Sequence, residues 1–187
     1  PVLEHPIVGN GSILYSGDTI EKLDIMERMT LSNMAAELGA QSGLIEPDEK
    51  TADYITLAGG NPGDWQKFKS DPEANYRTLH EFNTGDLEPQ VAVPHSPANA
   101  AAVGNVGKDK IDQFYIGACT GAKLNDLEMA AAVLKGNKIA SGKRLTIAPA
   151  SSRILMQATK RGVIEVLLEA GANLLPPGCG ACAGYGV

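Results

Sequence analysis

The stretch IDQFYIGACTGAKLNDLEMAAAVLKG (residues 111–136) decides most of the fold of this chain. Its first part (111–118) is apolar and aromatic and predicts a strand, while its last part (123–136) is rich in Ala and Leu and predicts a helix that ends at Gly136. Cys119 directly follows the predicted strand. Ligands of parallel sheets gather at the carboxyl ends of the strands, so Cys119 lies where function is expected.

The same alternation continues to the end of the chain. Residues 144–150 predict a second strand, and 151–162 predict a helix with Ser151 or Ser152 as its N-cap. The apolar run 163–171 and the sequence ANLLPPG then lead to a cysteine pair, Cys179 and Cys182. Strands that alternate with amphipathic helices predict an α/β fold with mostly parallel, helix-covered sheets.

The first half of the chain also shows alternating elements, followed by a less regular region. It predicts strands at 12–17 and 41–47, and helices at 18–23 with Asp18 as N-cap, at 25–40 with a stop signal at Gly39, and at 48–57. Residues 59–75 are loop-like, 76–84 predict a half-buried strand, and the proline-containing stretch 85–105 predicts a linker. We therefore expect two lobes, 1–84 and 85–187.

Composition and charge exclude several classes of protein. The chain has 187 residues, of which 43% are hydrophobic and 20% charged, as in ordinary globular proteins. No apolar run is long enough to cross a bilayer, and no secretory signal is present at the start, so we expect a cytoplasmic protein. The net charge of -6, without blocks of like charge, argues against nucleic acid as a partner.

The three cysteines are spaced C-x59-C-x2-C, and several interpretations fit that pattern. In one interpretation, Cys119 is a small buried hydrophobe and the C-x-x-C pair is coincidental or redox-active. A structural zinc site normally has four ligands, and His5, His80 and His95 show no paired spacing that would complete one. An electron-transfer iron-sulfur cluster usually has four thiolates, whereas three thiolates would leave one iron open to substrate, which favours catalysis.

Four segments of the chain, in order, resemble the aconitase and 3-isopropylmalate dehydratase family of hydro-lyases. Two of them surround Cys119 and the cysteine pair, and the others are ERMTLSNMAAELGAQSGLIEPDE (27–49) and LEPQVAVPHSP (87–97). The resemblance implies that Cys119, Cys179 and Cys182 ligate a [4Fe-4S] cluster whose fourth iron has no cysteine ligand. It also implies the reversible dehydration of a hydroxy di- or tricarboxylic acid, in an enzyme of the kind used in amino-acid biosynthesis.

The segment SNMAAE adds two candidate catalytic residues. Asn33 and Glu37 are four residues apart on the predicted helix and would share one face. Without the resemblance, a solvated polar stripe would explain them. By the resemblance, Asn33 hydrogen-bonds near the cluster and Glu37 contacts the substrate hydroxyl or water.

Two departures from the family pattern bear on the substrate and on completeness. This chain has Cys119-Thr120-Gly121 where many relatives have Cys-Thr-Asn, which favours the isopropylmalate and dimethylmalate branch over citrate. The family's N-terminal lobe, a following arginine-rich segment and the swivelling domain have no counterpart here. We therefore expect a central portion of a larger enzyme, inactive alone, that works with a small swivel-domain subunit. The alternative is a non-catalytic α/β module that binds a metal or a partner subunit.

Overall fold

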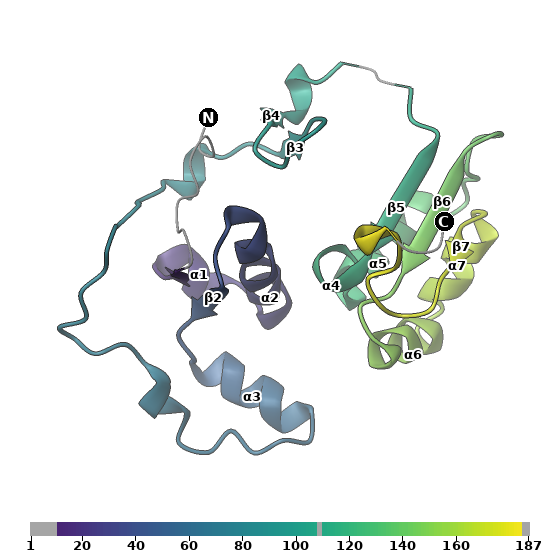
Figure 1. Ribbon diagram of the computed structural model, residues 1–187. Helices are drawn as coiled ribbons and strands as arrows, with labels where there is room; N and C mark the ends of the chain where they lie inside the picture. The colour runs from purple at the N-terminus through teal and green to yellow at the C-terminus, as the bar shows by residue number, and fades with distance from the viewer. Residues whose placement is uncertain (1–10, 108–109, 185–187) are drawn as a thin grey trace. The chain divides into compact units, whose positions relative to one another are not determined.

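The computed structural model describes residues 11–107 and 110–184, and the chain divides into two compact units, 1–108 and 109–187 (Figure 1). The predicted lobes, 1–84 and 85–187, differ from these units in where residues 85–108 are placed, and they remain a prediction.

The second unit is built on a three-stranded parallel sheet in the order β5-β6-β7 (Figure 1). Along the chain its elements are β5 (Gln113–Gly117), α4 (Ala118–Gly121), α5 (Leu124–Leu134), β6 (Arg144–Ala148), α6 (Ser152–Lys160), α7 (Val163–Glu169), β7 (Asn173–Leu174) and the 3-10 helix η5 (Gly180–Ala183). Gly117 at the end of β5 lies opposite Ala148 at the end of β6. A parallel sheet packed with helices confirms the predicted α/β fold.

An apolar core holds this unit together. Leu127 of α5, Ile147 of β6 and Leu167 of α7 are fully buried, and smaller apolar side chains of α6 and α7 complete the cluster. Each such side chain contributes roughly 1.5–3 kcal/mol relative to full exposure. The core therefore fixes β6 and its neighbour β5, and β5 leads directly to Cys119, the first candidate ligand.

Local signals set the ends of the helices in this unit. Ser151 is the N-cap of α6, and its Oγ accepts a hydrogen bond from the Ile154 backbone N–H at 3.2 Å. That contact confirms one of the two predicted caps. Gly136 follows α5 with a φ of 77°, in the left-handed region that glycine tolerates best.

The first unit contains a smaller parallel pair of strands with helices beside it. Its elements are β1 (Ser12–Tyr15), α1 (Asp18–Lys22), α2 (Ile25–Met34), the 3-10 helix η1 (Ala35–Leu38), β2 (Ser42–Ile45) and α3 (Glu49–Leu57). β2 contains Gly43, where an added Cβ would lie 2.9 Å from the Ser32 Cα and 2.8 Å from the Ala35 Cβ. A glycine is needed there because α2 and η1 pack directly against the strand.

The elements predicted between residues 12 and 57 are largely confirmed, with two corrections. Asp18 is the first residue of α1 and not its N-cap, which is Gly17; its charge still favours the start of the helix. The predicted helix 25–40 is α-helical only to Met34 and continues as a 3-10 turn that stops at Gly39.

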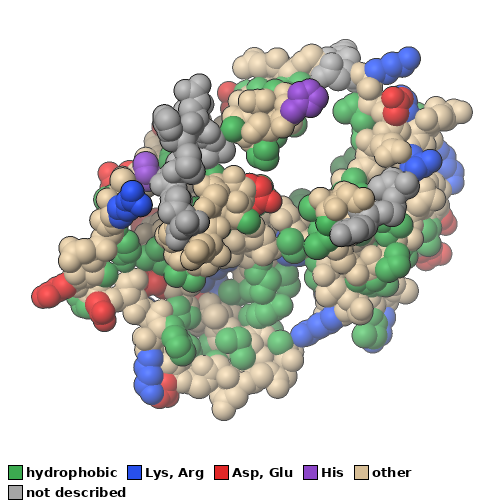
Figure 2. Space-filling model, in the orientation of Figure 1, with side chains coloured by type: hydrophobic (Ala, Val, Ile, Leu, Met, Phe, Trp, Pro, Cys, Tyr) green, Lys and Arg blue, Asp and Glu red, His purple; other side chains and the backbone are tan. Residues whose placement is uncertain are grey.

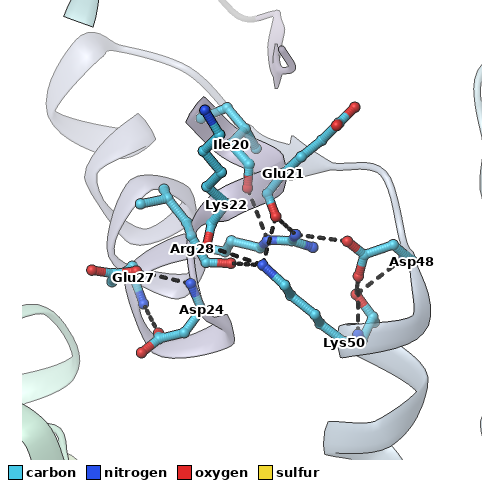
Figure 3. A network of polar contacts seen from close by, with 10 residues as sticks. Ile20, Glu21, Lys22, Asp24, Glu27, Arg28, Asp48 and Lys50 are labelled. Carbon is cyan, nitrogen blue, oxygen red and sulfur yellow. Dashed lines mark hydrogen bonds and ion pairs between the residues drawn. The ribbon is translucent and has the colours of Figure 1, made fainter. Parts of the chain in front are cut away.

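A polar network takes the place of an apolar core between these helices (Figure 3). The Arg28 side chain is 5% exposed, and its Nη2 donates to Asp48 Oδ2 at 2.7 Å and to the Glu21 carbonyl at 3.1 Å. Lys50 Nζ donates to the carbonyls of Glu21, Lys22 and Leu23. The two cations thus satisfy the carbonyl groups at the end of α1 that have no intrahelical partner.

The remainder of the first unit is mostly irregular. It contains the 3-10 turns η2 (Trp65–Phe68), η3 (Thr84–Asp86) and η4 (Val103–Asn105), and a short antiparallel hairpin of β3 (Gln90–Ala92) and β4 (Ala100–Ala102). The strand predicted at 76–84 is wrong: those residues are irregular until Thr84 begins η3. They pair with no strand within the described part of the chain, and their large apolar side chains, Tyr76, Leu79 and Phe82, are exposed.

The surface agrees with the charge pattern of the sequence. On the face shown in Figure 2, basic and acidic side chains are interspersed. Among the described residues, no helix combines the length and the apolar character needed to span a bilayer.

Candidate functional site

Cys119 is the second residue of the short helix α4, at a sharp turn that directly follows β5. Ala118, the residue before it, is buried and has a φ of 63°, which costs a residue with a side chain about 1 kcal/mol. The turn brings the backbone from the end of β5 directly into α4, and the Cys119 side chain is exposed. Exposure removes the interpretation of Cys119 as a small buried hydrophobe.

Lys123 stabilises the backbone around Cys119 through hydrogen bonds. Its side chain is almost fully buried, and its Nζ donates to the carbonyl of Cys119 at 3.3 Å and to that of Thr120. Asp126 Oδ2 lies 3.2 Å from the same Nζ and also accepts the Lys123 backbone N–H at 2.9 Å. The buried ammonium group of Lys123, which is paired with Asp126, therefore contacts the backbone of Cys119, the first candidate ligand.

Cys179 is the N-cap of the 3-10 turn η5 and Cys182 lies within that turn, which packs beside β5 (Figure 1). The Cys182 N–H donates to the Cys179 carbonyl at 3.0 Å, which closes the turn. Just before it, the Gly178 N–H donates to the Pro149 carbonyl at 3.2 Å and anchors the loop beyond the end of β6. Both cysteines are exposed.

Tyr115 joins the two cysteine-bearing segments. It lies on β5, and its phenol O–H donates to the Cys179 carbonyl at 2.7 Å. Burial is the largest cause that raises the pKa of Tyr115. Charge repulsion from Cys182 and, more weakly, from Cys179 raises it further, and a hydrogen bond from the Cys182 backbone partly offsets this rise. A phenol is protonated at neutral pH even at its ordinary pKa of about 10, so the hydroxyl acts as the donor.

The three thiols are thus presented at the carboxyl edge of the sheet, as the sequence predicts for Cys119. Within the described residues, no three His, Cys, Asp or Glu side chains are close enough to hold a single metal ion. A [4Fe-4S] cluster has a different requirement, because each thiolate binds a separate iron. All three thiols lie within the described residues and form no disulfide.

The backbone beside the cysteines leaves room for an inorganic group. An added Cβ at Gly121, Gly178 or Gly184 would meet no atom within 4 Å. Gly178 and Gly184 have positive φ, so their backbone conformation already favours glycine, but Gly121 does not. Three thiols that form no disulfide are the donor set that a cluster held by three thiolates requires.

Asn33 and Glu37 belong to the first unit, on different elements. Asn33 is in α2 and Glu37 is in η1, and both side chains are exposed. The change from α-helix to 3-10 helix alters the rotation per residue, so the four-residue spacing is not that of one regular helical face. Their role next to the cysteines remains a prediction.

The two histidines in the described part of the chain belong to no group that could hold a metal ion. His80 and His95 are exposed in the irregular part of the first unit, and His5 lies outside the described residues.

Tyr115 and Lys123 are two residues of this region that are not predicted from the sequence. Tyr115 reads as one more aromatic residue of a strand, and its partner is 64 positions away. Lys123 carries a local signal, because Asp126 follows three residues later at the start of the helix, but nothing in the sequence reveals that its ammonium group is buried.

Comparison with known proteins identifies the family of this chain. The model of the aconitase family (aconitate hydratase) matches residues 4–186. The chain belongs to the aconitase family. The matched region includes Cys119, Cys179 and Cys182 as well as Asn33 and Glu37.

Curated relatives of the chain are large subunits of dehydratases. It is 46% identical over 172 residues to the 3-isopropylmalate dehydratase large subunit 1 of Pyrococcus furiosus, a match that covers 91% of this chain and 40% of the relative. It is 44% identical over 173 residues to a probable methanogen homoaconitase large subunit of Methanosarcina mazei, which covers 92% of this chain and 43% of the relative. The chain therefore spans about two fifths of the length of these relatives.

Proposed function

We propose that this chain is the cluster-binding portion of an iron-sulfur hydro-lyase that reversibly dehydrates a hydroxy di- or tricarboxylic acid. One observation carries the proposal. In a chain matched to the aconitase family over residues 4–186, Tyr115 on the strand leading to Cys119 hydrogen-bonds to Cys179 in the turn that also contains Cys182. All three thiols are exposed there.

Cys119, Cys179 and Cys182 would hold a [4Fe-4S] cluster through their Sγ atoms. When bound, such a cluster supplies a Lewis-acidic iron without a thiolate ligand. The Lys123 ammonium, buried beneath Cys119, would offset part of the negative charge that three thiolates bring to this edge of the sheet.

Two exposed residues of the first unit would act on the substrate. The Asn33 amide would donate or accept a hydrogen bond near the cluster, and the Glu37 carboxylate would contact the hydroxyl group that leaves or returns as water. A carboxylate positioned at a reacting hydroxyl typically contributes 10²–10⁴-fold to the rate as a general acid or base. The dehydratase activity is proposed for the assembled enzyme, since the chain spans about 40% of its relatives.

The substrate and the partner follow from the names of the relatives. Several are 3-isopropylmalate dehydratase large subunits, so we propose a 3-isopropylmalate-like hydroxy acid as the substrate. A large subunit implies a small one, and a small swivel-domain subunit is therefore the proposed partner.

Anaerobic reconstitution with ferrous iron and sulfide tests the cluster. The expected result is about three to four irons per chain, with a three-iron EPR signal that disappears when more ferrous iron is added. Cys119→Ser and Cys179→Ser should abolish the signal, whereas Ser141→Ala, an exposed loop substitution in the same unit, should leave it unchanged. Iron binding that survives both cysteine substitutions would refute the proposed ligand set.

One observation favours the alternative of a module that binds a partner subunit. The irregular part of the first unit exposes several large apolar side chains, namely those of Tyr76, Leu79, Phe82, Leu87, Val91 and Val103. Exposed apolar groups of this kind mark interaction surfaces when they are contiguous. A chain that binds the small subunit but never takes up iron would support this alternative.

A further inference from the structure

Two glycines make room for Tyr115 between the cysteine-bearing segments. A Cβ at Gly117 would lie 2.0 Å from the Tyr115 ring, so the ring leans along β5 over that glycine. A Cβ at Gly180, inside the cysteine turn, would lie 3.3 Å from the Tyr115 hydroxyl. The ring therefore extends from the strand toward the turn through space that only glycines leave open.

The Tyr115 hydroxyl binds the same carbonyl oxygen that closes the cysteine turn. The Cys179 carbonyl accepts two hydrogen bonds, one from the Cys182 N–H at 3.0 Å and one from the Tyr115 hydroxyl at 2.7 Å. The first closes the turn between the two cysteines. The second ties the closed turn to β5, four residues before Cys119.

We infer that Tyr115 is a positioning residue that fixes the Cys179-Cys182 turn against the Cys119-bearing strand and so sets the separation of the three thiols. This inference rests on the proposed function, because its consequence is the retention of a cluster. The cysteines are the ligands, and the Tyr115 hydrogen bond holds Cys179 and Cys182 at a fixed distance from Cys119. Without this hydrogen bond, the turn would sample positions in which three thiolates cannot bind one cluster together.

Tyr115→Phe removes the donor and keeps the ring over Gly117. Hydrogen exchange of the apo chain should show amides in 178–184 exchanging about fivefold faster, which is the effect of losing one partly exposed hydrogen bond. The reconstituted chain should lose iron to a chelator faster by a similar factor and show a broadened EPR signal. Circular dichroism should remain unchanged.

Tyr15→Phe is the matched control, because it removes a phenol hydroxyl from β1 in the other unit. Its exchange in 178–184 and its rate of iron loss should equal those of the parent chain. A Tyr115→Phe chain that matches this control in both measurements would overturn the inference.

A pair of substitutions tests the geometry separately. Gly117→Ala should displace the Tyr115 ring and accelerate exchange in the cysteine turn at least as much as Tyr115→Phe does. In a Tyr115→Ala chain, the added Cβ has no ring to meet, so Gly117→Ala should then have little further effect. Equal effects in both backgrounds would show that Gly117 does not serve Tyr115.

Failure of the inference and failure of the proposed function give different results. A parent chain that takes up no iron overturns the proposed function, and with it the role of Tyr115 in retaining a cluster. A parent chain that binds iron, beside a Tyr115→Phe chain that holds it equally well, overturns only the role of Tyr115.

Discussion

The two units stabilise their candidate residues in different ways. In the second unit an apolar core from α5, β6, α6 and α7 fixes the strand that leads to Cys119. In the described part of the first unit, the buried residues are Arg28, Ala35 and Ala102, and a charged network joins α1, α2 and α3. The apolar framework of the second unit should therefore tolerate changes of pH and salt better than the charged framework that carries Asn33 and Glu37.

The largest effect should come from Leu127→Ala in the core of the second unit. Leu127 is fully buried, so the substitution should lower the free energy of unfolding of that unit by about 2–5 kcal/mol. Hydrogen exchange in denaturant would measure it for residues 110–184. The fluorescence of Trp65, the single tryptophan of the chain and part of the first unit, should report little change. An equal loss in both units would show that they unfold together and would break the comparison.

Arg28→Met should have the next largest effect, in the first unit. It removes donors to two carbonyls and leaves Asp48 without its ion pair, which should cost about 2–3 kcal/mol. Trp65 fluorescence during urea unfolding would measure the change. Lys67→Met is the control, because the Lys67–Asp64 pair is 72% and 73% exposed and should contribute less than about 1 kcal/mol. Similar losses in the two variants would contradict the proposed importance of the buried network.

Gly43→Ala should follow, with a cost of about 1–2 kcal/mol in the first unit. The added Cβ would lie within 3 Å of Ser32 and Ala35 atoms, so α2 must move away from β2. Because α2 carries Asn33, the assembled enzyme should lose turnover more than it loses iron. Gly104→Ala, at an open position of the same unit, is the matched control. Unchanged turnover would show that the placement of α2 does not matter for activity.

The smallest effect should be the pH dependence that comes from Asp48. The hydrogen bond from Arg28 is the main cause that lowers the pKa of Asp48, and burial opposes it. A lowered folded-state pKa gives stability that is present above the unfolded value of about 4 and is lost as pH falls below it. Trp65-monitored stability should thus fall as the pH decreases below about 4, and Asp48→Asn should flatten that fall. An unaltered profile in the variant would assign the pH dependence to other carboxylates.

Much of the second unit could be predicted from its sequence. The period of apolar residues, the cap at Ser151 and the glycine at Gly136 are local signals, and each lies where the structure has the corresponding element. The strand predicted at 76–84 is wrong because a strand also needs a neighbouring strand to pair with, which a local pattern of apolar and polar residues does not reveal. Residues 90–102, predicted as linker, did find such a neighbour and form a hairpin.

The sequence by itself determined the alternation of strands and helices, the position of Cys119 after a strand, and the family, because these depend on residues close together in the chain. Tertiary structure alone decided that Tyr115 reaches Cys179, that Lys123 is buried beneath Cys119, and that Arg28 replaces an apolar core. Those contacts join distant positions or depend on burial. The type of a side chain determines which groups it can bind, but only the folded chain brings such a group close to it.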